Sequence, residues 1–168
     1  MNTLTSIDYA HLIQFTATKM YRVLLNKTQV NKILFYIYGV YLASHETPLF
    51  TDDTPKVWTY GPVFPRSNKK IVSCEKIERN RFTEEQIEAF QSDKAFLSRI
   101  VNIVGNMCNK SAFSLSQWSH EEGSPWYRTL YIKDEITGKI TGQKPWNTPV
   151  NLDYIKEYFS NSKNTVFG

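Results

Sequence analysis

The sequence predicts a mainly α-helical fold with a minor β-strand component, in one compact domain over residues 1–168. Apolar residues recur at steps of three and four through most of the chain, which is the period of an amphipathic helix. Helix-capping residues precede most of these segments. Only one short stretch alternates in the way that a strand does. The 41% hydrophobic fraction suffices for one core and excludes a disordered chain.

Two helices are expected in the first 45 residues. Ser6 is predicted to cap the first, whose apolar positions continue at helical spacing to Leu24. Thr28 is predicted to cap the second, which runs to about His45 and carries apolar or aromatic residues on most sides. Such a helix belongs at the centre of a core. Gly39 within it costs about 1 kcal/mol relative to alanine, so we expect a close helix crossing there.

A strand and then a basic helix are expected next, after a loop over residues 47–55. Lys56–Tyr60 is the predicted strand, and the turn-forming pair Gly61-Pro62 ends it. Pro62 and Pro65 then open a helix that runs to about Glu78, because proline is tolerated in the first helical turn.

Capping boxes predict the two helices that follow. Thr83 and Gln86 form the first box, and a long apolar stripe behind it reaches Cys108. Ser114 and Gln117 form the second box, which is predicted to open a short helix.

The remaining elements are a short helix, an irregular segment and a last helix. Ser124-Pro125 places serine at a cap and proline at the first helical position, so a helix restarts there. Asp134–Thr148 has little periodicity and is expected to be a loop or a marginal hairpin. Asn151 is predicted to cap the last helix.

The net charge of +4 is concentrated in one segment, residues 66–81. That segment carries six basic residues against Glu75 and Glu78, an excess of four that equals the excess of the whole chain; the six are Arg66, Lys69, Lys70, Lys76, Arg79 and Arg81. A local basic surface favours an acidic partner surface or a nucleic-acid backbone, although a solvated helix face explains it equally well. Nucleic acid is the weaker alternative, because no helix-turn-helix, zinc-finger or RNP-type pattern accompanies the segment.

Motifs for catalysis are absent from the sequence. It contains no GxxxxGK[ST], GxGxxG or GxSxG pattern, and its three histidines have no metal-ligand spacing. His120 precedes two glutamates, but adjacent helical residues face different directions and cannot converge on one substrate atom. We therefore predict no catalytic residue, no metal and no cofactor, and a binding protein rather than an enzyme.

The sequence also favours a cytoplasmic protein. Cys74 and Cys108 are far apart and lack a CxxC spacing, so free thiols in a reducing compartment are expected. No apolar run approaches the roughly 20 residues of a membrane span. Residues 1–18 lack the basic-then-apolar pattern of a secretory signal.

Three stretches in order resemble a known family. Val30–Ala43 reads VNKILFYIYGVYLA, Val57–Pro65 reads VWTYGPVFP, and Leu115–Trp126 reads LSQWSHEEGSPW, with IKEYF at Ile155–Phe159 closing the match. Together they resemble the Panacea domain, also called the SocA-like antitoxin or phage-associated protein family, over about residues 7–159. The chain departs from the family pattern at Lys32-Ile33-Leu34, Thr59, Phe64 and Ser119-His120, and its loop 134–148 is longer.

The resemblance implies a mainly helical antitoxin domain that neutralises a protein toxin encoded beside it. It also implies an alternative, because one branch of the family delivers its toxin to a cytoplasmic protease. A nucleic-acid-binding regulator that uses the basic segment remains a third hypothesis.

The motif residues have structural or partner-binding roles in this interpretation. We expect Trp58, Gly61, Pro62, Pro125 and Trp126 to shape the fold, with core favoured over interface for the two tryptophans. The basic segment and the aromatic turn before it are the expected toxin-binding surface. The residues proposed for it are Tyr60, Phe64, Arg66, Lys69, Lys70 and His120, the last of which suits either role.

Overall fold

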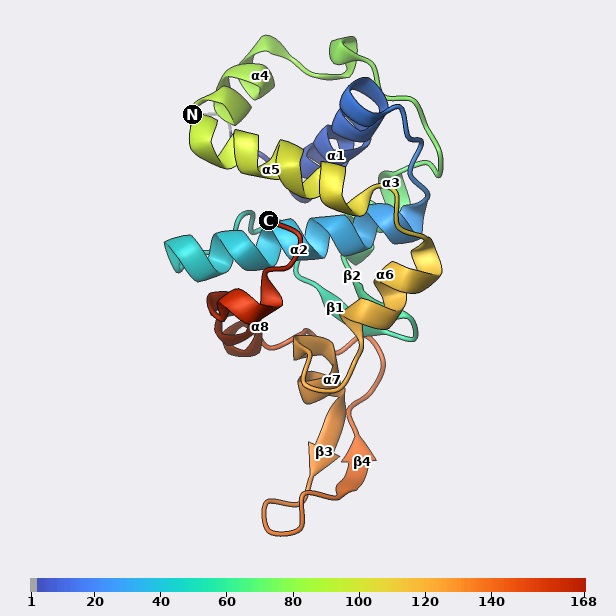
Figure 1. The fold of residues 1–168 in the computed structure, drawn as a ribbon, viewed down its shortest axis with the longest axis vertical. Coiled ribbons are helices and arrows are strands. Elements are labelled where there is room, and N and C mark those ends of the chain that lie inside the picture. The colour runs from blue at the N-terminus through green and yellow to red at the C-terminus, as the bar shows by residue number, and fades with distance from the viewer. Residues whose placement is uncertain (1–2) are drawn as a thin grey trace.

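The computed structural model describes residues 3–168 and confirms the mainly helical prediction. Within these residues eight α-helices, two short 3-10 helices and two antiparallel strand pairs form one body (Figure 1). The α-helices are α1 (Ser6–Tyr21), α2 (Lys27–His45), α3 (Pro65–Lys70), α4 (Glu84–Gln91), α5 (Lys94–Met107), α6 (Ala112–Ser119), α7 (Pro125–Leu130) and α8 (Leu152–Ser160). The remaining elements are β1 (Lys56–Trp58), β2 (Gly61–Val63), η1 (Arg79–Arg81), β3 (Tyr131–Lys133), β4 (Ile140–Gln143) and η2 (Ser162–Asn164).

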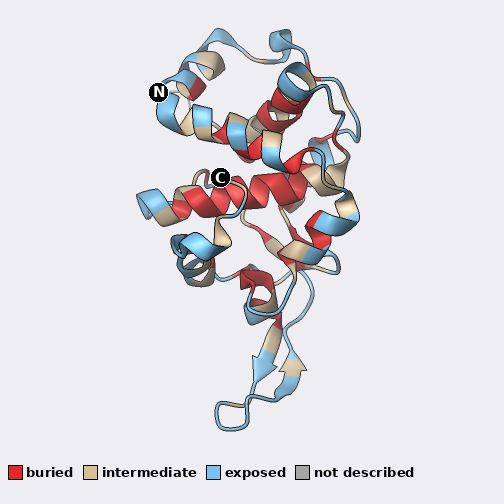
Figure 2. Cartoon of the chain, viewed as in Figure 1, coloured by how far each residue is buried: buried red, intermediate tan, exposed pale blue. Residues whose placement is uncertain are grey.

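Helix α2 is the centre of the core, as its composition predicts. Every residue from Val30 to Val40 is buried. Helices α1 and α5 lie on one side of α2, and β1, β2 and α8 lie on the other (Figure 1). The buried colour covers most of the length of α2, whereas the helices around it are buried mainly on their inner faces (Figure 2).

Gly39 marks the close crossing that was expected within α2. A Cβ atom at this position would overlap the ring of Phe159 on α8. The same ring packs edge-on against Tyr36 at a centroid distance of 5.3 Å. The helix propensity lost at Gly39 is therefore offset by the packing of α8.

The first two helices begin earlier than predicted. Thr5 caps α1 in a capping box with Asp8, and Ser6 instead donates its hydroxyl to Asp52 at 2.8 Å. Asn26 caps α2 in a capping box with Gln29, so the predicted cap at Thr28 is wrong. In both cases the earlier residue accepts a hydrogen bond from the N3 amide and donates its own amide to the N3 side chain, so two backbone amides are satisfied.

The predicted single strand is one arm of a hairpin. Strand β1 pairs antiparallel with β2, with Val57 opposite Pro62 and Trp58 opposite Gly61. The chain reverses at residues 59–60, so the pair Gly61-Pro62 starts a second strand and does not end the first. Gly61 has φ +111°, a backbone conformation that L side chains rarely adopt.

The predicted basic helix to Glu78 is wrong, because α3 ends at Lys70. Ile71 and Ile77 lie on the irregular chain that follows, and both are buried. On a continuous surface helix, two residues six positions apart would point in different directions, and one face could not bury both. The segment is held by Gln14, whose side-chain amide donates to the Val72 carbonyl at 3.0 Å. The basic residues of this segment therefore lie on α3, on the irregular chain that follows it and on η1.

The long helix expected after Thr83 is divided into α4 and α5. The capping box of Thr83 with Gln86 is confirmed. Asp93 then caps a new helix by accepting a hydrogen bond from the Phe96 amide at 3.0 Å. Helical spacing continues across the break, which explains why the periodicity alone predicts one helix.

The last third of the chain follows the prediction more closely. Ser111, rather than Ser114, caps α6, while Ser124 caps α7 and Asn151 caps α8 as expected. The irregular segment contains the hairpin β3–β4, which projects from the body of the molecule (Figure 1).

Candidate partner-binding site

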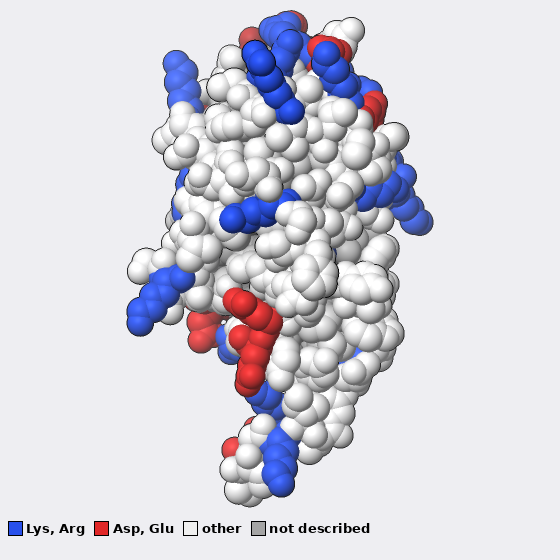
Figure 3. All heavy atoms as spheres, turned by 45° about the vertical axis from the view of Figure 1, so that its right-hand side comes forward, with Lys and Arg blue, Asp and Glu red and all other residues white. Residues whose placement is uncertain are grey.

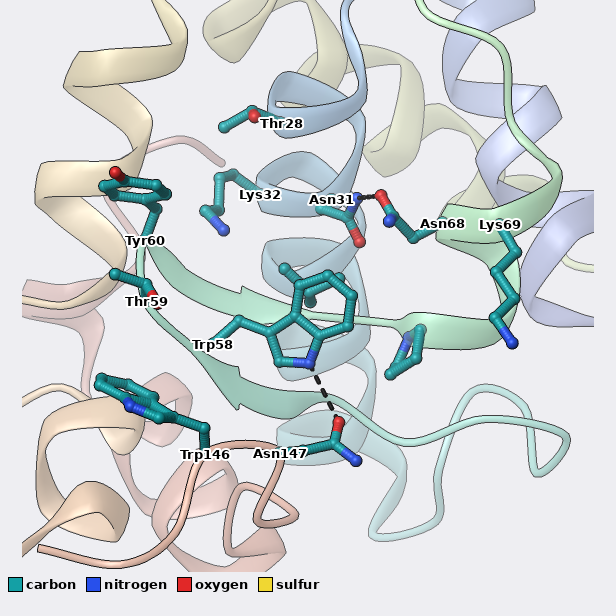
Figure 4. A pocket seen from close by; sticks show the side chains of 12 residues that line it. Thr28, Asn31, Lys32, Trp58, Thr59, Tyr60, Asn68, Lys69, Trp146 and Asn147 are labelled. Atoms are coloured by element: carbon teal, nitrogen blue, oxygen red, sulfur yellow. Dashed lines mark hydrogen bonds between the residues drawn. The ribbon is translucent and has the colours of Figure 1, made fainter.

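An open pocket of about 850 Å³ lies beside the turn of the β1–β2 hairpin. We call it the hairpin pocket. Helix α2, the hairpin, α3 and residues 146–147 line it, as the close-up in Figure 4 shows. The lining residues are Thr28, Asn31, Lys32, Trp58, Thr59, Tyr60, Val63, Pro65, Asn68, Lys69, Trp146 and Asn147.

Three aromatic side chains form the apolar part of this pocket. Trp58 is half-buried, and its indole nitrogen donates to the Asn147 side-chain oxygen at 3.0 Å (Figure 4). Tyr60, at the hairpin turn, is 72% exposed, and Trp146 is 48% exposed. Trp126 supports the hairpin from inside by donating to the Trp58 carbonyl at 2.9 Å. The exposed rings are therefore held on a fixed backbone.

Lys32 places a buried ammonium group against the hairpin. The residue is only 1% exposed, and its Nζ atom donates to the Pro62 carbonyl at 2.9 Å. Burial lowers the pKa of this side chain from 10.5 to about 7, because an ammonium ion loses its hydration there. Gly61 lies directly against it: a Cβ atom at Gly61 would lie 3.1 Å from Nζ and would overlap the Ser119 hydroxyl.

Asn31 holds the elements around the pocket together. Its side-chain oxygen accepts from the Phe64 amide at 3.0 Å, and its amide nitrogen donates to the Asn68 side chain at 2.9 Å. Lys27 donates to the Asn68 carbonyl at 2.9 Å. These bonds join α2 to α3 and to the residue that links α3 to the hairpin, and they hold these walls of the pocket together.

Within the basic segment 66–81, the charges that lie near the pocket are those of α3. Further along the segment Lys76, Arg79 and Arg81 form ion pairs with Glu78, Glu84 and Glu75 respectively. By contrast, no carboxylate among residues 3–168 forms an ion pair with the three basic residues of α3, which are Arg66, Lys69 and Lys70. Lys and Arg side chains at the top of the molecule have Asp and Glu beside them, while the middle of the same face is mostly uncharged (Figure 3).

The structure separates the residues that the sequence proposed for partner binding. Tyr60 and Lys69 line the hairpin pocket, and Arg66 and Lys70 are exposed on the neighbouring α3. Phe64 is fully buried against Tyr38 and Phe50, so it offers no surface to a partner.

His120 lies outside the hairpin pocket. Its ring is 5.3 Å from the ring of Trp126, and its Nδ1 atom is buried without a hydrogen-bond partner in the described part of the chain. Trp126 is a core residue with 3% exposure, as expected. Gly61, Pro62 and Pro125 are also buried and shape the backbone around the two tryptophans.

Sequence reasoning missed the parts of the pocket that come from distant segments. Trp146 and Asn147 reach it from the irregular segment, for which no sequence signal existed. Lys32 did have a signal, because a lysine within a helix predicted to be apolar on most sides must be buried or reach its edge.

The described residues contain no ready-made centre for metal chemistry. Between residues 3 and 168, no three His, Cys, Asp or Glu side chains are placed to hold a metal ion. Cys74 is exposed, and burial raises the pKa of the Cys108 thiol. None of the helices in this range is long and apolar enough to cross a membrane.

The structure is a small helical domain with an open pocket on its surface. The family model described as "Antitoxin SocA-like, Panacea domain" matches residues 30–127, which is more than half of the chain. The chain therefore belongs to this family, and the match includes all of the hairpin pocket except Thr28, Trp146 and Asn147. No curated protein and no solved structure matches the chain.

Proposed function

We propose that this protein is a cytoplasmic antitoxin that binds and neutralises a protein toxin encoded beside its gene, with no catalytic step. Membership of the SocA-like antitoxin family is the observation that carries this proposal. Helices α1 and α8 lie outside the matched range but pack on α2, which supports one functional domain over residues 1–168.

The hairpin pocket and the adjoining face of α3 are the proposed toxin-binding surface. Tyrosine, tryptophan and arginine dominate the energy of protein interfaces, and Tyr60, Trp146 and Arg66 present these groups here. Lys69 and Lys70 add positive charge that has no internal ion-pair partner among residues 3–168. A partner with an acidic surface would complement this face.

A proteolytic adaptor is the second candidate, since a second apolar surface supports it. An adaptor must contact the toxin and the protease at once, so it needs two separate surfaces. The projecting hairpin β3–β4 carries three exposed isoleucines, Ile132, Ile136 and Ile140, of which Ile136 is 95% exposed. A nucleic-acid regulator has less support, because three of the six basic residues in the segment 66–81 already pair with glutamates.

Co-expression with the product of the neighbouring gene tests the antitoxin proposal. We expect that product to stop growth alone and to be harmless beside this protein. Its half-life distinguishes the two mechanisms: a blocking antitoxin leaves the half-life unchanged or lengthens it, whereas an adaptor shortens it. A harmless neighbour, or one that stays toxic in the presence of this protein, contradicts the proposal.

A further inference from the structure

The hairpin pocket contains a buried cation without a counter-charge. Its two charged lining residues are Lys32 and Lys69, and none of the twelve lining residues is an aspartate or glutamate. Lys32 uses one of its three N–H donors, on the Pro62 carbonyl. A buried ammonium group with donors to spare costs free energy that a carboxylate in contact with it would recover.

The walls of the pocket indicate which kind of ligand would carry that carboxylate. The Trp58 N–H is already bonded to Asn147, so the Trp58 indole offers the pocket an apolar ring, and the rings of Tyr60 and Trp146 line the same pocket. In Figure 4 the Trp58 indole lies between the side chains of Lys32 and Asn147. A ligand that fits these walls has an apolar stem and a negatively charged tip, which describes a glutamate or aspartate side chain beside an apolar residue.

We propose that the hairpin pocket receives an acidic side chain of the toxin, whose carboxylate accepts hydrogen bonds from Lys32 while its stem packs between Trp58 and Tyr60. Lys69 at the pocket attracts the same charge. This inference rests on the proposed antitoxin function and specifies the chemistry by which the toxin is recognised.

The charge arrangement favours a protein carboxylate over a nucleic-acid backbone. A nucleic acid would need a row of unpaired cations along a groove. Here the basic residues of the segment 66–81 beyond α3 are paired with glutamates, and the one buried cation, Lys32, lies in an open pocket whose lining includes three aromatic side chains. A single carboxylate on a side chain can reach Lys32, whereas a chain of phosphates has no second buried cation to follow.

Zero-length cross-linking of the purified complex with the neighbouring gene's product tests the contact directly. A water-soluble carbodiimide adds to a carboxylate, and a neutral lysine amine in contact with it then displaces the urea to form an amide. We expect mass spectrometry of the complex to find Lys32 joined to an aspartate or glutamate of the partner.

Variants with matched controls measure the energetic contribution of the pocket. We expect Lys32→Met and Tyr60→Ala each to raise the Kd for the same partner at least about tenfold, with salt weakening the wild-type complex. Phe113→Ala on α6 removes an aromatic ring that is equally exposed, at 73% against 72% for Tyr60, and lies outside the pocket. Its Kd should be unchanged.

The outcomes separate the inference from the function on which it rests. If the complex forms but Lys32 is not cross-linked and Tyr60→Ala binds normally, the pocket inference is wrong and the antitoxin proposal stands. Cross-linking at Lys69 alone, with normal binding by Lys32→Met, also contradicts the inference, because it places the partner only at the pocket's edge. If no complex forms and growth is not rescued, both proposals fail. If Lys32→Met does not fold, the Lys32 cross-link and the Kd of Tyr60→Ala still test the pocket inference.

Discussion

The Nζ atom of Lys32 lies 2.9 Å from the Pro62 carbonyl oxygen, and this hydrogen bond joins α2 to the β1–β2 hairpin. Pro62 belongs to the stretch VWTYGPVFP that resembles the family, and Lys32 lies in the stretch VNKILFYIYGVYLA. The two stretches are thus one structural unit. Its buried side carries Tyr38 and Phe64, and its open side carries the hairpin pocket.

Gly61→Ala should destabilise the fold by about 2–4 kcal/mol, because the substitution adds a steric overlap to backbone strain. The residue has φ +111°, and its Cβ atom would overlap the Ser119 hydroxyl. Gly123→Ala is the matched control, since φ is +88° there and nothing lies within 4 Å of a Cβ. The control should lose only about 1 kcal/mol in urea unfolding. Equal losses for the two variants would show that the contact with Ser119 is unimportant.

Gly39→Ala should destabilise the crossing of α2 and α8 by about 1–3 kcal/mol, the usual cost of overpacking a core. The added methyl group would overlap the ring of Phe159. In the background Phe159→Ala, where that ring is gone, the same substitution should cost much less and could even stabilise α2 through helix propensity. The double-mutant cycle in urea checks this. Additive effects would contradict the close crossing.

Lys32 should make the stability of the protein depend on pH above neutrality. Its pKa is about 7 in the folded protein and 10.5 when unfolded, so between these values the unfolded chain binds the extra proton. The free energy of unfolding therefore rises with pH through this window and is independent of Lys32 well below pH 7. Between pH 7 and 9 the rise attributable to Lys32 should be about 2 kcal/mol.

Comparison of wild type with Lys32→Met isolates this effect. Tyr38, whose pKa burial raises to about 12, is common to both proteins and cancels in the difference. Urea unfolding at pH 6, 7, 8 and 9 should show a difference in stability between the two proteins that grows in favour of wild type as pH rises. Parallel pH profiles would mean that Lys32 is charged throughout.

The central helix and half of the six predicted caps could be predicted from local sequence, because capping and apolar spacing are short-range properties. Thr83, Ser124 and Asn151 are confirmed caps. The basic helix failed because two buried residues, Ile71 and Ile77, draw the chain into an irregular path that local propensity does not encode.

The hairpin pocket could be predicted only in part, because tertiary contacts assemble it. The sequence singled out Trp58, Tyr60 and Lys69, which all line the pocket. It could not place Trp146 in the same pocket as Trp58, since the two are 88 positions apart in the sequence and no periodic pattern precedes Trp146. The basic helix was expected to run to about Glu78, but only its first turns form a helix, α3, and only these line the pocket.

The toxin-binding surface should tolerate loss of exposed side chains without loss of the fold. Lys69→Glu reverses a charge at the pocket and should abolish rescue of growth, while the melting temperature changes by less than about 2 °C, because surface substitutions rarely affect stability. Lys139→Glu, on the exposed turn between β3 and β4, is the matched charge reversal and should still rescue. Rescue by both variants would place the toxin elsewhere on the molecule.

Growth of cells that express the neighbouring gene's product, with and without this protein, tests the antitoxin account most directly. We predict that the product alone reduces viable counts by several orders of magnitude and that wild-type protein restores them. Tyr60→Ala, made at the same level and equally folded, should not restore them. A neighbouring product that is harmless alone, or that kills equally in the presence of the wild-type protein, would contradict the account.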